Sequence, residues 1–206
     1  MKILVTGATG FIGNHLINEL LKNESYEIIA TSRNIDKAKR FDWFDKVRYI
    51  SYDLEHNHDE NLFELFDNPN KVIHLAWDGL PNYNDLMHIE KNLFNHYRFV
   101  KNMVRNGLKD IVITGTCFEY GMKNGCLSEG MSAEPSNSYA IAKDTLRKFV
   151  MELNKEFDFD YKWIRLFYMY GEGQSEKSLV ELLDKAIKNG DEQFNMSGGE
   201  QLRDFL

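Results

Sequence analysis

Tyr139 and Lys143 stand four residues apart in a stretch with the polar and apolar pattern of a helix, so their side chains share one face. A nearby ammonium group favours the phenolate and lowers the barrier for the tyrosine to exchange a proton with a hydroxyl group. Tyrosine needs this help at neutral pH, because its unperturbed pKa lies near ~10. Both residue types are common on helix surfaces, so the pair gains meaning only from the segments around it.

Three glycines near the N-terminus form a second candidate site. Gly7, Gly10 and Gly13 follow the apolar run 3–6 and open a helix-like stretch. Glycines allow a tight turn and let a diphosphate approach the backbone, while the unpaired N–H groups and the positive dipole end of the helix face the anion. A plain strand-to-helix turn is the alternative. The position after a strand and before a helix favours a dinucleotide diphosphate.

The segment 6–13, TGATGFIG, resembles the fingerprint of the extended short-chain dehydrogenase/reductase family, also called the NAD-dependent epimerase/dehydratase family. Members of that family act on nucleotide sugars, and the resemblance covers the whole chain. It implies that this turn binds the cofactor. The residues expected to do so are Gly7, Thr9, Gly10, Phe11 and Ile12.

Two further segments resemble cofactor-binding segments of the family. Residues 52–54, YDL, are similar to its GDL segment, which implies that Asp53 contacts the adenine, beside Leu54. Residues 74–77, HLAW, are similar to its HLAA segment, which runs along the cofactor; His74 itself is expected to be a core residue. The other residues expected beside the cofactor are Leu75, Ala76, Trp77, Asn92 and Thr114. For Asn92, a solvated position on a helix is the alternative.

The catalytic residues lie in two segments that also resemble the family. Residues 135–143, PSNSYAIAK, are similar to its PxSxYxxSK segment, and residues 115–121, GTCFEYG, to its SSxxVYG segment. The resemblance implies that Tyr139 is the acid and base, that Lys143 tunes it and holds the nicotinamide ribose, and that the Thr116 hydroxyl hydrogen-bonds the substrate oxygen.

Two departures from the family pattern narrow the reaction. The family's 4,6-dehydratases carry an acidic pair directly after the catalytic Thr, where this chain has Cys117 and Phe118, so dehydration is not expected. Glu119 follows one place later and would face the other way in an extended chain. Residues 165–171, RLFYMYG, resemble RxFNVYG, but Tyr168 replaces an Asn that commonly reaches the substrate phosphates. Substrate contacts are therefore expected to differ here.

The choice of dinucleotide depends on the end of the second strand, about 20 residues after the glycines. NAD-binding members of the family carry Asp at or near the position of Thr31. Without that carboxylate nothing repels a 2′-phosphate, and Arg33 can bind one through its forked guanidinium. The sequence thus favours NADP(H). The alternative for Arg33 is an exposed loop residue without a ligand. Asp36 is near enough in the sequence that NAD(H) stays the alternative cofactor.

The elements that must position these residues alternate between apolar, β-branched runs and helical patterns. Repeated β–α units predict an α/β fold of Rossmann type, a doubly wound parallel sheet with helices on both faces. The expected strands are 3–6, 28–31, 47–51, 72–76, 111–114 and 163–167, and the expected helices are 11–23, 36–44, 59–66, 84–106 and 138–157.

The chain is expected to hold an NAD(P)-binding domain over residues 1–170, which includes the catalytic residues. Residues 171–206 carry several glycines around a helix at 178–189 and predict the beginning of a small substrate-binding lobe. The last residues, 198–206, resemble a GGxQxRDFxxVxD segment after which family members continue. We therefore expect a lobe that is truncated, whether the chain is a fragment, a disrupted reading frame or a designed piece.

Composition excludes several classes of protein. The chain has 206 residues and a net charge of −7, which argues against nucleic-acid binding because phosphate contacts need clustered Lys and Arg. Two cysteines predict no disulfide framework and fit a reducing cytoplasm. No apolar run approaches the ~20 residues needed to span a bilayer. No metal site is expected.

The leading functional hypothesis is hydride transfer at C4 of a nucleotide-linked hexose. Reduction of a 4-keto-6-deoxy sugar is favoured slightly by Arg33 and by the missing acidic pair, and a nucleotide-sugar 4-epimerase is the alternative. A dinucleotide-binding module without turnover is a second alternative, because the substrate lobe is expected to be incomplete. The resemblance also implies a homodimer formed through the two long helices, 84–106 and 138–157.

Overall fold

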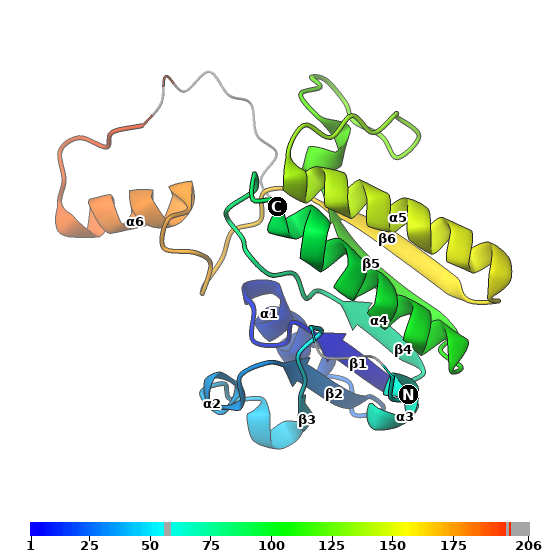
Figure 1. Ribbon diagram of the computed structural model, residues 1–206. Coiled ribbons are helices and arrows are strands. Elements are labelled where there is room, and N and C mark those ends of the chain that lie inside the picture. Colours follow the sequence, from blue (N-terminus) through cyan, green and yellow to red (C-terminus); the bar gives the residue numbers. More distant parts are fainter. Residues whose placement is uncertain (56–58, 197, 199–206) are drawn as a thin grey trace. The chain divides into compact units, whose positions relative to one another are not determined.

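The computed structural model of the protein describes residues 1–55, 59–196 and 198. The chain forms two compact units, Met1–Arg165 and Leu166–Leu206 (Figure 1). The first contains the sheet and every residue discussed above as catalytic or cofactor-binding. The expected GGxQxRDF segment lies outside the described residues, apart from Gly198.

One six-stranded sheet forms the first unit, with the order β3-β2-β1-β4-β5-β6. The pairings of β1 with β2 and β4, of β2 with β3 and of β4 with β5 are parallel. The order reverses direction between β1 and β4, and in such sheets ligands bind outside the carboxyl ends of the strands at that point. The strands are β1 (Lys2–Thr6), β2 (Glu27–Ser32), β3 (Arg48–Ser51), β4 (Lys71–His74), β5 (Asp110–Thr116) and β6 (Asp160–Leu166).

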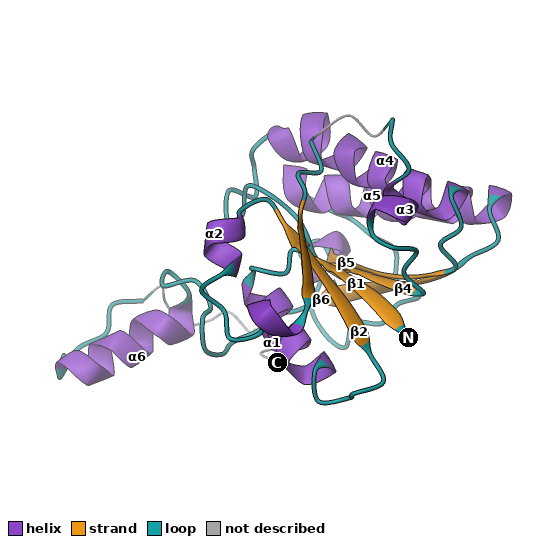
Figure 2. Cartoon of the chain, turned by 90° about the horizontal axis from the view of Figure 1, so that it is seen from below, coloured by secondary structure: helices purple, strands orange, loops and turns teal. Residues whose placement is uncertain are grey.

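Helices cover both faces of this sheet, as Figure 2 shows with α3, α4 and α5 on one face and α1 on the other. Each face has its own hydrophobic core. One core gathers Phe99 and Leu146 from the long helices, and the other gathers Ile17 with the fully buried Trp43. The helices of this unit are α1 (Phe11–Leu20), α2 (Ile35–Ala38), α3 (Leu62–Leu65), α4 (Leu93–Arg105) and α5 (Ser138–Glu156), with short turns η1 (Phe44–Lys46), η2 (His88–Asn92) and η3 (Cys117–Tyr120).

The predicted doubly wound Rossmann-type fold is confirmed, and the differences concern the bounds of both helices and strands. The helix expected over 84–106 begins at His88 with a π-helical turn, η2, and becomes α-helical only at Leu93. The Asp85 carboxylate instead accepts a hydrogen bond from Met87 N at 2.9 Å, which holds the preceding residues in a turn. A π-helical turn inside a helix is often found at a functional site, which makes η2 relevant below.

The second unit contains α6 (Leu179–Asn189). The Ser178 side chain caps its first turn, and Gly190 ends it in the left-handed conformation, as the pattern of residues 178–189 predicts. None of the helices in the described part of the chain is long and apolar enough to cross a membrane. Within residues 1–55, 59–196 and 198, no group of three His, Cys, Asp or Glu side chains is placed to hold a metal ion.

Candidate functional site

The glycine turn joins β1 to α1 and owes its shape to two close approaches. Gly7 has a φ of +69°, and a Cβ there would lie 2.8 Å from the backbone nitrogen of Ala76. A Cβ at Gly13 would overlap the carbonyl oxygen of Gly7. Gly10 is the N-cap of α1, so the first amides of the helix follow it directly. The turn therefore lets the segment after β4 approach the end of β1 closely and presents a helix N-terminus at the sheet edge.

A cavity of about 330 Å³ lies at this edge, over the carboxyl ends of β1, β2 and β4. Most of the residues predicted to bind cofactor line it: Gly7, Thr9, Gly10, Arg33, Asp53, Leu54, Leu75, Ala76, Trp77 and Asn92. Phe11 and Ile12 instead belong to the first turn of α1, next to Gly10. Thr114, Tyr139 and Lys143 form the neighbouring cluster described below.

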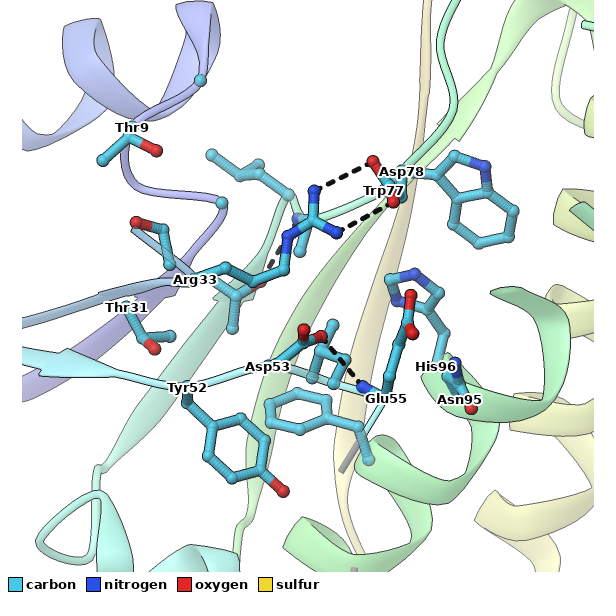
Figure 3. A pocket seen from close by; sticks show the side chains of 18 of the residues that line it. Thr9, Thr31, Arg33, Tyr52, Asp53, Glu55, Trp77, Asp78, Asn95 and His96 are labelled. Carbon is cyan, nitrogen blue, oxygen red and sulfur yellow. Dashed lines mark hydrogen bonds and ion pairs between the residues drawn. The ribbon is translucent and has the colours of Figure 1, made fainter. Parts of the chain in front are cut away.

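One end of the cavity carries an ion pair that the sequence did not predict (Figure 3). The Arg33 guanidinium donates two hydrogen bonds to the Asp78 carboxylate, at 2.9 and 3.0 Å. This contact with Arg33 holds the pKa of the Asp78 carboxyl below its usual value, so Asp78 is charged. The loops after β2 and β4 face each other here, so the Arg33 guanidinium is already paired with the Asp78 carboxylate of the same chain.

The residues present fit a dinucleotide. The hydroxyl of Thr31 lines the same cavity, is buried, and has no hydrogen-bond partner within the described part of the chain. A buried polar atom without a partner costs free energy unless a ligand or water satisfies it. Together with the helix N-terminus after Gly10, this orphaned hydroxyl is consistent with a ligand that is anionic at its centre and carries hydroxyl groups at one end.

The three predicted catalytic residues come together although they lie on different elements. Thr116 ends β5, whereas Tyr139 and Lys143 lie in the first two turns of α5, and all three side chains are buried. The Thr116 side chain lies beside the Tyr139 hydroxyl, close enough to act on its pKa. The Lys143 ammonium donates a hydrogen bond to the Thr114 carbonyl at 2.7 Å. This fixes the ammonium beneath the end of β5 and near the phenol.

Burial dominates the acid–base properties of this cluster. It raises the pKa of Tyr139 well above its usual value, although the neighbouring Thr116 side chain opposes this shift. It also lowers the pKa of Lys143 to about 7, against the opposing effect of the Glu119 charge. Lys143 can therefore change its charge near neutral pH, which a solvated lysine does not.

Trp77 connects the cavity to the catalytic cluster. Its ring lines the cavity, stands edge-on to the Tyr139 ring at 5.8 Å, and lies 4.1 Å from the Lys143 ammonium. Its indole N–H donates to Nδ1 of His88 at 3.1 Å, and the His96 ring stacks on it at 4.5 Å. The cavity and the cluster of Thr116, Tyr139 and Lys143 are therefore adjoining parts of one site.

Asn92 is buried rather than solvated. It lies in η2, lines the cavity, and donates a hydrogen bond to the Asp78 carbonyl at 3.0 Å. His88, one turn earlier, is also buried, and its ring lies 5.4 Å from the Tyr139 ring. The four-residue spacing of His88 and Asn92 was the available sequence signal for two polar side chains on one helical face.

The residues after Thr116 form a turn rather than a continued strand. Cys117 is half-buried, and burial raises the pKa of its thiol. Glu119 is completely buried, and its carboxylate accepts a hydrogen bond from the Thr116 amide at 2.9 Å. His74, expected in the core, is buried and hydrogen-bonds Thr6 and His96, at 2.8 and 2.7 Å.

Comparisons with known proteins show which family the chain resembles. The chain is 30% identical over 207 residues to a dTDP-6-deoxy-L-talose 4-dehydrogenase (NAD(+)) of Aggregatibacter actinomycetemcomitans, covering 100% of this chain and 75% of that protein. It is 27% identical over 222 residues to the dTDP-4-dehydro-6-deoxyglucose reductase of Escherichia coli, covering 99% of this chain and 68% of the relative.

A similar solved structure is the UDP-glucuronic acid 4-epimerase of Bacillus cereus in complex with UDP-glucuronic acid and NAD. Its TM-score is 0.81 at 25% identity, over 100% of this chain and 68% of that one. The family model for the NAD dependent epimerase/dehydratase family matches residues 3–206. With that match over nearly its whole length, the chain belongs to the NAD-dependent epimerase/dehydratase family, whose members include nucleotide-sugar epimerases and reductases.

Proposed function

We propose that this protein reduces the 4-keto group of a nucleotide-linked 4-keto-6-deoxy hexose. The observation that carries the proposal is the buried cluster of Thr116, Tyr139 and Lys143, joined through Trp77 to the cavity beside the glycine turn. Packing alone does not require a hydroxyl, a phenol and an ammonium to meet at the end of one strand. Proton transfer beside a hydride donor does require these three groups to meet.

A bound dinucleotide would supply the hydride that adds to C4. Tyr139 would give its proton to the C4 oxygen, so that the carbonyl becomes a hydroxyl. The Thr116 hydroxyl, which lies beside Tyr139, would orient that oxygen. Lys143 would stabilise the phenolate left on Tyr139 until a proton replaces the one transferred.

The side chains after Thr116 favour reduction over elimination of water. Cys117 and Phe118 carry no carboxylate, and Glu119 is buried among hydrogen-bond donors behind the strand. The names of the two relatives, a 4-dehydrogenase and a 4-dehydro reductase, describe redox chemistry at the same carbon. A 4-epimerase is the alternative, supported by the similarity to the Bacillus cereus structure.

The Arg33–Asp78 ion pair bears on the choice of dinucleotide. The sequence favours NADP(H), but a 2′-phosphate would have to displace the Asp78 carboxylate from Arg33. A ribose with a 2′-hydroxyl imposes no such competition. We therefore propose NAD(H) as the preferred cofactor, in agreement with the name of the 30% identical relative, and NADP(H) as the alternative.

The test is a turnover assay with a dTDP-linked 4-keto-6-deoxy hexose and either NADH or NADPH. The proposal predicts stoichiometric loss of reduced nicotinamide and formation of a 4-hydroxy sugar, both greatly slowed in Tyr139→Phe. A 4-epimerase would interconvert 4-hydroxy sugars without net consumption. Cofactor binding by calorimetry with no turnover of any such substrate would reject the reductase and favour a dinucleotide-binding module.

A further inference from the structure

Glu119 is a buried carboxylate that the mechanism above does not use. It lies in η3, three residues after Thr116, and none of its surface is exposed to solvent. A charged carboxylate is costly to bury unless its oxygens accept hydrogen bonds from several donors. The identity of those donors therefore indicates why a carboxylate stands at this position.

Its oxygens accept hydrogen bonds from two strands. Oε1 accepts from the Thr116 amide at 2.9 Å and from the Trp163 indole at 3.0 Å. Oε2 accepts from the Arg165 guanidinium at 2.8 Å and again from Trp163 at 3.1 Å. Arg147 of α5 lies 4.0 Å from the same oxygen. The carboxylate thus ties the end of β5 to β6, with α5 alongside.

The contact between Glu119 and Trp163 explains why residue 115 is a glycine. A Cβ at Gly115 would overlap both the Trp163 indole nitrogen and the Glu119 carboxylate. The backbone there does not have the positive φ that favours glycine, so space alone explains the residue. Glycine at position 115 is what lets Glu119 and Trp163 meet directly beneath the strand that carries Thr116.

The contact acts on Thr116 at both its backbone and its side chain. Glu119 binds the Thr116 amide, while the Thr116 hydroxyl accepts a hydrogen bond from the Phe118 amide at 3.3 Å, completing a reciprocal capping box. The same hydroxyl lies beside the phenol of Tyr139 and acts to lower its pKa. The direction of the Thr116 hydroxyl toward Tyr139 therefore depends on a turn that the carboxylate closes.

We propose that Glu119 is a positioning residue for the reduction. It holds Thr116 in the conformation in which the Thr116 hydroxyl faces Tyr139 and the substrate oxygen. Gly115 leaves space for the Glu119 carboxylate, and Trp163 donates a hydrogen bond to it. This inference rests on the proposed role of Thr116. Glu119 does not exchange protons with the substrate, because both of its oxygens are occupied by donors that themselves belong to the fold.

The test compares Glu119→Gln, Gly115→Ala and Trp163→Phe in the full chain. Glu119→Gln keeps the shape of the side chain but removes its charge. It also replaces one accepting oxygen by an NH2 group that cannot accept from the surrounding donors. Gly115→Ala keeps the charge but pushes the Glu119–Trp163 pair away from the strand. Asp110→Asn is the matched control, because it removes a carboxylate that pairs with Lys71 at 2.6 Å at the opposite end of β5. Turnover, cofactor affinity and amide exchange at Thr116 are measured for each.

We expect Glu119→Gln and Gly115→Ala to lower kcat by about 100-fold, because small displacements of a reacting group have effects of that order. The KM for the nucleotide sugar and the Kd for NADH should stay within about threefold, since binding is not what is lost. Hydrogen exchange at the Thr116 amide should accelerate at least about tenfold, because its acceptor is weakened. Trp163→Phe should give a smaller effect in the same direction, and Asp110→Asn none.

Two outcomes would overturn the inference. One is a Glu119→Gln variant with wild-type kcat and wild-type exchange at Thr116. The other is a loss of cofactor affinity as large as the loss of kcat, which would mean a general structural role. Failure of the proposed function looks different: the wild-type chain would reduce no 4-keto sugar, while exchange at Thr116 would still report whether Glu119 holds it.

Discussion

The ammonium nitrogen of Lys143 lies 4.1 Å from the centre of the Trp77 ring. Trp77 stands where the family's HLAA segment has its last alanine. The lysine is buried, so the face of the indole and the Thr114 carbonyl replace part of its lost hydration. A buried ammonium held this way remains costly, which is why the pKa of Lys143 falls to about 7. This relationship leads to a prediction about stability and pH.

Lys143→Met should stabilise the protein below pH 7, and the gain should shrink as the pH rises. The folded-state pKa of Lys143 is about 7, and its unfolded value is 10.5. Below pH 7 both states carry the proton, and the folded state bears the full cost of the buried charge. Between the two values the unfolded chain binds more protons than the folded one, so wild-type stability rises with pH. Above 10.5 the cost is gone.

Urea unfolding of the wild type and Lys143→Met across this pH range checks the prediction. The exposed Lys162 provides the matched control, because Lys162→Met removes a solvated ammonium from the same unit. A stability difference for Lys143→Met that is independent of pH would contradict the lowered pKa.

Tyr139→Phe should lower kcat by about 10²–10⁴-fold, the usual contribution of a positioned acid or base. The ring remains in contact with Trp77 and His88, so NADH affinity should be retained. Steady-state assays and calorimetry on the same samples separate the two effects. Thr116→Ser keeps the hydroxyl and should remain far more active than Thr116→Val, and equal activity of these two variants would argue against the role proposed for Thr116.

Asp78→Asn should shift the cofactor preference toward NADPH. The change removes the anionic partner of Arg33 and frees its guanidinium for a 2′-phosphate. We expect a change of about tenfold in the ratio of kcat/KM for NADPH and NADH, typical of one charge-assisted contact. Asp36→Asn is the control, because Asp36 pairs with Lys39 and does not line the cavity. If both variants shift the preference equally, the effect is one of net charge.

The protein should form a homodimer through α4 and α5, the two long helices, which pack side by side on one face of the sheet (Figure 1). Each presents large apolar side chains to solvent, among them Phe94, Ile141 and Met151. Phe94→Glu should therefore produce a monomer, because it places a charge on the apolar surface. Light scattering coupled to size-exclusion chromatography measures the mass. A monomeric wild type at all concentrations would contradict the prediction.

The sequence predicted those parts of the site that depend on local pattern and on the parallel sheet. The strands could be recognised as buried apolar runs, and parallel strands bring their carboxyl ends to one edge, so the glycine turn had to lie near the residues after β4 and β5. Tyr139 and Lys143 share a face because of helical geometry. Thr116 could be placed beside them only through the family resemblance.

The features that the sequence did not predict are contacts between loops. Arg33 and Asp78 are 45 residues apart, and no periodicity tells which two loops will face each other across a cavity. The orphaned hydroxyl of Thr31 is likewise visible only when all its neighbours are known. For Glu119, alternation along a strand predicted a side chain facing away from the substrate, but the chain forms a turn there and the carboxylate returns to the strand.

The position of Trp77 also gives the protein an internal optical reporter. The chain has three tryptophans; Trp43 is fully buried in the opposite core, and Trp163 lies behind β5 against Glu119. Trp77 alone among them lines the cavity that we assign to the dinucleotide. Reduced nicotinamide absorbs light in the range in which tryptophan emits, so a bound cofactor should quench Trp77 by energy transfer. Binding and release could then be followed in real time, without substrate and without any added dye.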